Sequence, residues 1–166
     1  RIKMKNISGT LIVLGDNITT DKIIPEYNYT SDEKKLSGII LQGLDEKFPQ
    51  MLNGAGIIVA GENFGSGNHI EPAIEGLKLV GIKCIIALSF GRDFYRKAIN
   101  SGLVLINLNL TGDVSTGDDI EISITRGKVI HKDQEYKFFA FPDYVCTIIE
   151  MGGIINAVKK KLGKHA

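Results

Sequence analysis

Short apolar runs bounded by glycines predict three buried strands in the middle of the chain, over residues 56–60, 83–88 and 103–106. Between the first two, apolar residues recur at helical spacing over 70–80, and Gly81 follows as the residue that ends the helix. A second helix is predicted from a cap at Ser89 to Asn100. Strands that alternate with helices in this way predict an α/β unit with parallel strand pairing.

The flanking segments follow other patterns. Apolar and β-branched residues predict a strand over 9–14, and residues 16–25 are predicted to form a loop. Helices are expected from Ser31–Asp32 through Gly43 and over 44–51. Beyond Gly112, strands over 119–124 and 128–139 predict an antiparallel hairpin with one wet face, and helices follow over 142–151 and 154–162.

Length, composition and charge narrow the class of protein. The 166 residues suit one domain over 1–166, and 43% hydrophobic with 23% charged residues is typical of soluble proteins. A net charge of +1 argues against a nucleic-acid partner, and the absence of a long apolar run argues against a membrane span. With no signal peptide visible and only two cysteines, a reducing cytoplasm is the expected compartment.

The chain alone offers poor material for a metal site. Cys84 and Cys146 lie far apart in apolar contexts, so they cannot supply the thiolates of an iron–sulfur cluster. The three histidines lack the spacing of metal ligands. We therefore expect this chain to bind no cofactor or metal itself, and any metal to come from another chain.

The most informative stretch is the glycine-rich loop over residues 61–71, between a predicted strand and a helix. Such a turn exposes backbone N–H groups at the start of the helix, where they favour an anion. The alternative is a tight turn with no function beyond structure. Gly61, Gly65 and Gly67 do not have the spacing of a dinucleotide-binding fingerprint, and no Gly-Lys-Ser/Thr follows as in a phosphate-binding P-loop.

Three segments in one order carry a resemblance to a known family. They are GDNITTDKIIP over 15–25, VAGENFGSG over 59–67 and SFGRDFYRKAINSGL over 89–103. Together with the Phe-Pro-Asp-Tyr, Gly-Gly and lysine-rich tail, they resemble the small subunits of 3-isopropylmalate dehydratase and homoaconitase. The resemblance covers nearly the whole chain.

The resemblance implies an α/β fold, a three-layer β/β/α swivelling domain with a mixed sheet, a C-terminal hairpin and helices. It also implies a partner, a large iron–sulfur subunit that holds a 4Fe–4S cluster, and a small hydroxy-acid substrate that is dehydrated and rehydrated. In that arrangement a metal acts as Lewis acid for the leaving hydroxyl and a nearby base removes a proton from carbon. The small subunit closes the site with its glycine loop, here Gly65, Ser66 and Gly67.

Three positions depart from the family pattern. Asn68 stands where the family has the serine thought to act as base, His69 replaces a second serine, and Ile70 replaces an arginine that clamps a substrate carboxylate. An amide cannot take up a proton as an alkoxide does, and isoleucine cannot pair with a carboxylate. The family's specificity loop often contains Tyr-Leu-Arg, and its nearest match here, at Tyr29, has no arginine.

These departures leave three interpretations open. In the first, His69 replaces serine as the base of an active enzyme, with Asn68 beside it. In the second, the chain is a paralogue that pairs with a large subunit as a binding or regulatory subunit. In the third, Asn68 and His69 are helix-cap residues. Asp21 matches a family acidic residue that reaches toward the partner's site, or it caps its own loop. The resemblance thus names Asn68, His69 and Asp21 as catalytic candidates, with Gly65, Ser66, Gly67, Ile70 and Tyr29 as substrate contacts.

Overall fold

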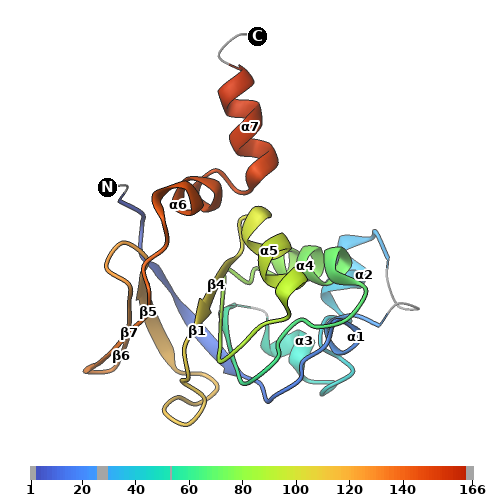
Figure 1. Ribbon diagram of the computed structural model, residues 1–166. Helices are drawn as coiled ribbons and strands as arrows, with labels where there is room; N and C mark the ends of the chain where they lie inside the picture. The colour runs from blue at the N-terminus through green and yellow to red at the C-terminus, as the bar shows by residue number, and fades with distance from the viewer. Residues whose placement is uncertain (1–2, 26–29, 53, 164–166) are drawn as a thin grey trace.

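A seven-stranded mixed sheet forms the centre of the computed structural model, which describes residues 3–25, 30–52 and 54–163. The strand order is β4-β3-β2-β1-β5-β6-β7. Figure 1 shows that the sheet curls, with the antiparallel strands β5 to β7 on one side and helices α4 and α5 on the other. The mixed α/β fold expected from the sequence is confirmed.

The parallel half of the sheet contains β1 (Ile7–Val13), β2 (Ala55–Ala60), β3 (Cys84–Ala87) and β4 (Val104–Asn107). Helices α4 (Ile70–Leu79) and α5 (Arg92–Asn100) connect β2 to β3 and β3 to β4. Cys84 to Ala87 are fully buried, which explains why β3 is a continuous apolar run rather than an alternating one. The predicted βαβαβ unit is confirmed, as is the end of α4, where Gly81 has φ +94°.

The antiparallel half has one strand more than the sequence predicted. The segment 128–139, expected as a single returning strand, divides into β6 (Lys128–His131) and β7 (Gln134–Lys137), which pair with each other. Lys132, at φ +53°, and Asp133 form the two-residue turn between them. Together with β5 (Asp119–Ser123) they make a three-stranded meander instead of a two-stranded hairpin.

The smaller helices also depart from the expected boundaries. A short helix α1 (Thr20–Ile23) lies within the segment predicted as a loop. Helix α2 (Glu33–Ser37) ends earlier than expected, with Gly38 as its C-cap residue, and α3 is limited to Phe48–Met51. At the C-terminus, α6 (Asp143–Glu150) and α7 (Ile154–Gly163) match the prediction. Across the described ranges, none of the helices has the length and apolar character needed to cross a bilayer.

The predicted cap of α5 is wrong. The helix begins at Arg92 with Gly91 as its N-cap residue, and Ser89 lies outside it. Phe90 instead forms a parallel bridge with Phe64, while the Ser89 hydroxyl accepts a hydrogen bond from the Asn63 N–H at 2.7 Å. The hydroxyl that local spacing assigned to the helix cap is thus used in a hydrogen bond to a residue 26 positions earlier in the chain.

A buried histidine ties the antiparallel half to the loop before it. His131, 5% exposed, lies on β6 with its Nε2 2.8 Å from Oδ2 of Asp118. The same carboxylate oxygen accepts the backbone N–H of Ser115 at 3.0 Å. The bond from Ser115 and then the bond to His131 lower the pKa of Asp118.

Replacing Asp118 by Asn tests this link. A carboxyl with a lowered pKa contributes stability above its ordinary pKa of about 3.9, and that contribution is lost as the pH falls through its lower pKa in the folded protein. Asp118→Asn should therefore unfold at lower urea concentration than the wild type at pH 7, and the difference should shrink below about pH 4. An Asp113→Asn variant, altered at an exposed turn, is the control. An equal difference at pH 7 and pH 3 would contradict the assignment.

Candidate functional site

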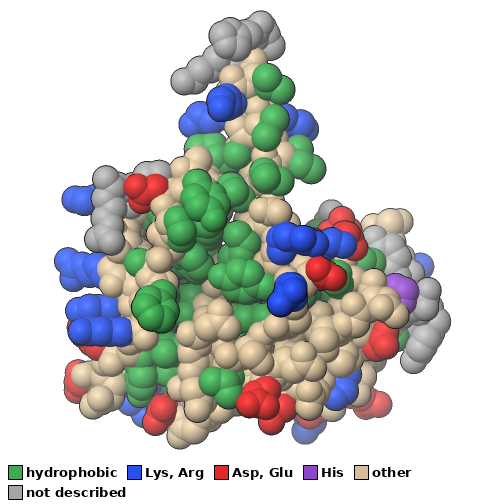
Figure 2. Space-filling view, viewed as in Figure 1, with side chains coloured by type: hydrophobic (Ala, Val, Ile, Leu, Met, Phe, Trp, Pro, Cys, Tyr) green, Lys and Arg blue, Asp and Glu red, His purple; other side chains and the backbone are tan. Residues whose placement is uncertain are grey.

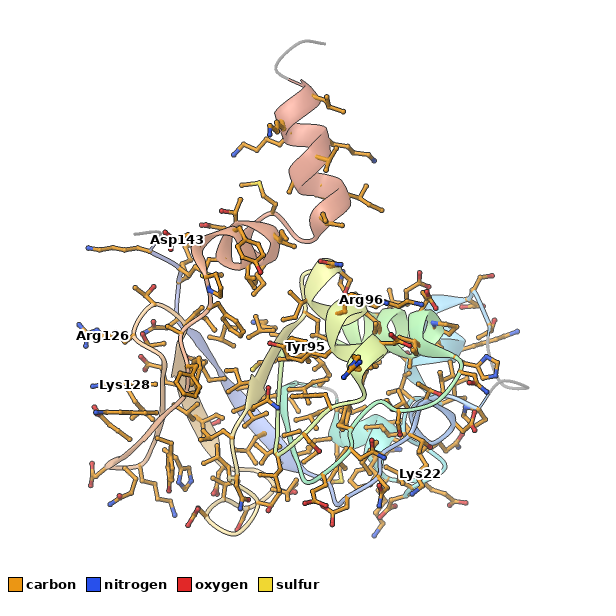
Figure 3. The ribbon with its side chains drawn as sticks, viewed as in Figure 1. Lys22, Tyr95, Arg96, Arg126, Lys128 and Asp143 are labelled. Atoms are coloured by element: carbon orange, nitrogen blue, oxygen red, sulfur yellow. The ribbon has the colours of Figure 1, made fainter. Side chains whose placement is uncertain are left out.

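The glycine loop between β2 and α4 is hydrogen-bonded along one side to residues 15–20, which follow β1. Asn17 donates its N–H to the carbonyl of Glu62 at 2.8 Å, and Gly65 donates to the carbonyl of Ile18 at 2.7 Å. Thr20 donates its N–H to the carbonyl of Ser66 at 2.8 Å. Lys22, labelled in Figure 3, adds a bond from its Nζ to the Asn17 carbonyl at 2.9 Å. The loop is therefore joined along its length to a segment about 45 residues earlier in the chain.

Residues 89–91, which follow β3, hold the loop from a second direction. Phe64 donates its N–H to the carbonyl of Ser89 at 3.0 Å, and Gly91 donates to the carbonyl of Phe64 at 2.8 Å. The fully buried Phe64 ring meets Phe90 and Phe94 edge-on, with ring centroids 6.2 Å and 5.6 Å away. The carboxyl ends of β1, β2 and β3 are thereby fixed against one another, at the edge where α/β sheets commonly bind ligands.

Two glycines are required by this close approach. Gly65 has φ +83°, and a Cβ at this position would overlap the Phe94 ring. Gly67 has φ +133°, and a Cβ there would meet the hydroxyl oxygen of Thr20. Each position thus combines a backbone conformation that favours glycine with a lack of space for any side chain. The two glycines predicted as substrate contacts therefore have a structural role, because they allow the loop to pack against Phe94 and Thr20.

The opposite side of the loop is open. Gly67 and Asn68 are exposed, and Ser66 and His69 are half-buried. Within the described parts of the chain, the backbone N–H groups of Ser66, Gly67 and Asn68 have no hydrogen-bond acceptor. They lie directly before the first turn of α4, a ten-residue helix whose N-terminus carries partial positive charge. This arrangement can bind an anion, as the sequence predicted for the loop.

His69 is placed by its backbone, not by a capping side chain. It is the N-cap residue of α4, with φ −100° and ψ 60°, and its side chain makes no capping hydrogen bond. Its N–H points to Oγ1 of Thr20 at 3.4 Å, and its carbonyl accepts the N–H of Ala73 at 3.3 Å. Its imidazole is therefore not used to start the helix.

Thr20 has a larger part in the site than its sequence context suggested. The residue is fully buried, yet both its backbone and its hydroxyl contact the glycine loop. It sets the distance between α1 and the start of α4, which positions His69. The neighbouring Asp21 is exposed in the first turn of α1, so it lies one residue along the chain from a direct loop contact.

The remaining candidates are distributed differently. Ile70 is 7% exposed and belongs to the hydrophobic core, so its side chain presents almost no surface to a substrate. Tyr29 lies outside the described residues. Arg92 and Arg96 are exposed on α5, and Arg96 pairs with Asp93 at 3.2 Å, where both side chains are about two-thirds exposed. Figure 3 shows Arg96 on this helix beside Tyr95.

One ion pair joins the start of α4 to α5. Lys97 donates from Nζ to Oε1 of Glu71 at 2.7 Å, and this bond lowers the pKa of Glu71. Both side chains are 41% or more exposed, so the pair contributes little to stability. It nevertheless places a cation and a carboxylate beside the helix that carries His69.

Among the residues that the structure describes, none of the side-chain groups fits an iron–sulfur cluster or another bound metal. Cys84 and Cys146 are both buried and are not joined in a disulfide, and burial raises the pKa of the Cys84 thiol far above its ordinary value. Over residues 3–25, 30–52 and 54–163, no group of three His, Cys, Asp or Glu side chains could hold a metal ion.

Comparison with known proteins identifies relatives along the whole chain. A family model described as the aconitase C-terminal domain matches residues 3–111. The 3-isopropylmalate dehydratase small subunit of Nautilia profundicola is 40% identical over 165 residues, which is 98% of this chain and 99% of that protein. Its counterpart from Caldicellulosiruptor saccharolyticus is 41% identical over 155 residues, 91% of this chain and 90% of that protein. A crystal structure of 3-isopropylmalate dehydratase from Methanocaldococcus jannaschii superposes with a TM-score of 0.86 at 37% identity, covering 95% of each chain.

Gly65→Ala tests the packing of the loop. Alanine at this position must adopt a left-handed backbone conformation, and its methyl group overlaps the Phe94 ring. The free energy of unfolding should therefore fall by about 2–4 kcal/mol. Urea unfolding followed by circular dichroism measures the change. Gly112→Ala is the matched control, because a Cβ at Gly112 would meet nothing within 4 Å. If the two variants lose equal stability, the Gly65–Phe94 contact does not hold the loop.

Proposed function

This chain belongs to the aconitase C-terminal domain family, among the 3-isopropylmalate dehydratase small subunits, and from that premise we propose how its glycine loop serves a dehydratase. Such a chain is one subunit of an aconitase-type hydro-lyase and implies a large partner subunit. The proposal assigns this chain the closing wall of a shared active site. The main support for this proposal is that the backbone N–H groups of residues 66–68 have no acceptor among the described residues, while other backbone groups of the loop are hydrogen-bonded to neighbouring segments.

The partner is proposed to hold the 4Fe–4S cluster, because the described residues of this chain contain no ligand set for it. When bound, such a cluster supplies a Lewis acid for a leaving hydroxyl group. The chain's own contribution is to bind, orient and exchange a proton with the substrate. Cys84 and Cys146 are buried and form no disulfide, which suits the cytoplasm, and we propose that compartment.

The substrate is proposed to be a small hydroxy acid held by a carboxylate at the start of α4. The N–H groups of Ser66, Gly67 and Asn68 are donors for carboxylate oxygens, and the helix N-terminus favours the negative charge. Charge-assisted bonds of this kind are stronger than neutral ones. They replace part of what a guanidinium group would supply at position 70, where Ile70 is buried in the core.

His69 is proposed as the proton acceptor. It directly follows the N–H row, its backbone is fixed through Thr20, and its imidazole makes no capping bond to α4. Histidine side chains exchange protons near neutral pH, so an imidazole can remove a proton from the carbon next to a carboxylate and later return it. Asn68 is proposed to orient the substrate through its amide, because an amide cannot serve as the base. Asp21 is proposed to contact the partner beside the loop.

A second function is favoured by the same departures. By the family resemblance, the serine base and the arginine clamp are replaced together, while the loop keeps its glycines and is held by backbone bonds to residues 15–20 and 89–91. A subunit that binds the large partner and regulates it, without completing its active site, would look the same in its fold. The two candidates differ in whether His69 matters for turnover.

The decisive experiment uses the complex of this chain with its large subunit, loaded with cluster. Hydration of a panel of unsaturated acids is measured for the wild type and for His69→Ala. If His69 is the base, kcat should fall by about 10²- to 10⁴-fold, with a smaller change in KM. Asn68→Ala is the comparison, and its kcat should fall far less.

Two outcomes would decide against parts of the proposal. Full kcat in His69→Ala, with an unchanged pH profile, would remove His69 as base. No turnover of any acid by a wild-type complex with a loaded cluster would favour the regulatory subunit. Failure of the chain to bind any cluster-carrying subunit would reject both functions.

A further inference from the structure

The glycine loop carries acidic side chains and no basic ones. Over residues 61–71 the carboxylates are those of Glu62 and Glu71, and the segment contains neither lysine nor arginine. A loop proposed to bind a carboxylate thus has like charges on its own side chains, and like charges placed close together oppose binding. The attraction of the α4 N-terminus for an anion therefore depends on how these carboxylates are neutralised.

Glu71 is the carboxylate that lies on the helix itself. It is in the first turn of α4, three residues after Asn68, which is at most about 11 Å along the chain. Its pKa is lowered first by the hydrogen bond from Lys97 and then by a hydrogen bond from its own backbone N–H. The second bond places this carboxylate at the start of the helix, where it is already an anion on the helix N-terminus. An unpaired Glu71 would therefore compete with a substrate carboxylate.

Lys97 neutralises Glu71 from the neighbouring helix. The Lys97 Nζ lies 2.7 Å from Oε1 of Glu71 and so joins α5 to α4, which pack against each other. Figure 2 shows cationic and acidic side chains next to one another where these two helices meet. Arg96, on the same helix, pairs with Asp93 instead. Among the residues that the structure describes, Lys97 is the one lysine or arginine that forms an ion pair with the glycine loop.

We infer that Lys97 is a specificity-determining residue, which lets the start of α4 accept an anionic substrate by cancelling the charge of Glu71. This role rests on the carboxylate-binding function proposed for the loop. A helix N-terminus is equivalent to about +0.5 elementary charge, so an unpaired Glu71 would change the local sum to about −0.5. With Lys97 in place the sum stays positive. The pair matters through this local charge, because an exposed ion pair adds little to stability.

The size of the effect follows from the distance and from the charge of the ligand. Two unit charges about 10 Å apart change an affinity about 2-fold in water and about 15-fold at the lower effective dielectric constant of a protein surface. A ligand with two carboxylates responds more strongly than a ligand with one. The effect also falls with ionic strength, because the screening length shrinks from about 30 Å at 0.01 M to about 10 Å at 0.1 M.

Titration of the full chain with succinate tests the role of Lys97 without requiring turnover. Succinate is a dicarboxylate with no hydroxyl group to eliminate, and NMR shifts of the backbone N–H groups of Ser66, Gly67 and Asn68 report its binding. Lys97→Met keeps a long side chain and removes the charge. It should raise the succinate Kd about threefold or more at about 0.01 M ionic strength, and less at about 0.1 M. Butyrate, with one carboxylate, should show a smaller rise.

Two further variants separate the local charge from other effects. Adding Glu71→Gln to Lys97→Met should restore the wild-type Kd, because no unpaired carboxylate is left at the helix start. Lys78→Met removes the same charge from the exposed last turn of α4, and its Kd should stay within about twofold of the wild type.

The outcomes distinguish the role of Lys97 from the proposed function. Equal Kd values for the wild type and Lys97→Met, or a double variant that binds as weakly as Lys97→Met, would overturn the role of Lys97 and leave the anion site standing. If succinate shifts none of the N–H groups of Ser66 to Asn68 in the wild type, the anion site itself is rejected, and the role of Lys97 with it.

Discussion

The close backbone contact between the glycine loop and its two neighbouring segments is the constraint on which the site depends. Gly65 lies against the Phe94 ring and Gly67 against the Thr20 hydroxyl, at positions with no room for a Cβ. That proximity lets residues 15–20 and 89–91 hydrogen-bond to the loop from two directions. The ends of three parallel strands therefore behave as one packed unit, and α4 starts from a fixed point.

Fixing one side of the loop determines what the other side can do. The backbone bonds that hold the loop go to residues 15–20 and 89–91, and among the described residues none of these bonds uses the N–H groups of Ser66 to Asn68. A row of donors that is already ordered loses little entropy when it binds an anion. The structural role of the glycines and the proposed binding role of the loop are thus two consequences of one packing arrangement.

The regular elements followed from local patterns, and the connections between them did not. Helical spacing over 70–80 predicted α4, because a helix buried on one face has apolar residues every three or four positions. The apolar run over 84–87 predicted β3, because a strand buried on both faces is apolar throughout. Ser89 was misassigned because its hydroxyl bonds to Asn63, a partner that no local rule identifies. The division of β6 from β7 at Lys132 was missed for a related reason, since lysine is not a typical turn residue. The role of Thr20 became visible only once the loop was folded against it.

The loop can keep its shape while its side chains change. The bonds that position it use the backbone of residues 62–66 and of His69, together with a threonine from α1. The side chains of Asn68 and His69 contribute no capping bond to α4, and Ile70 is accommodated in the core. Substitution at 68 and 69 can therefore change the side chains of the loop without disturbing the backbone bonds that position it. Separate atoms thus determine the path of the loop and the side chains that it carries, so the first can stay the same while the second change.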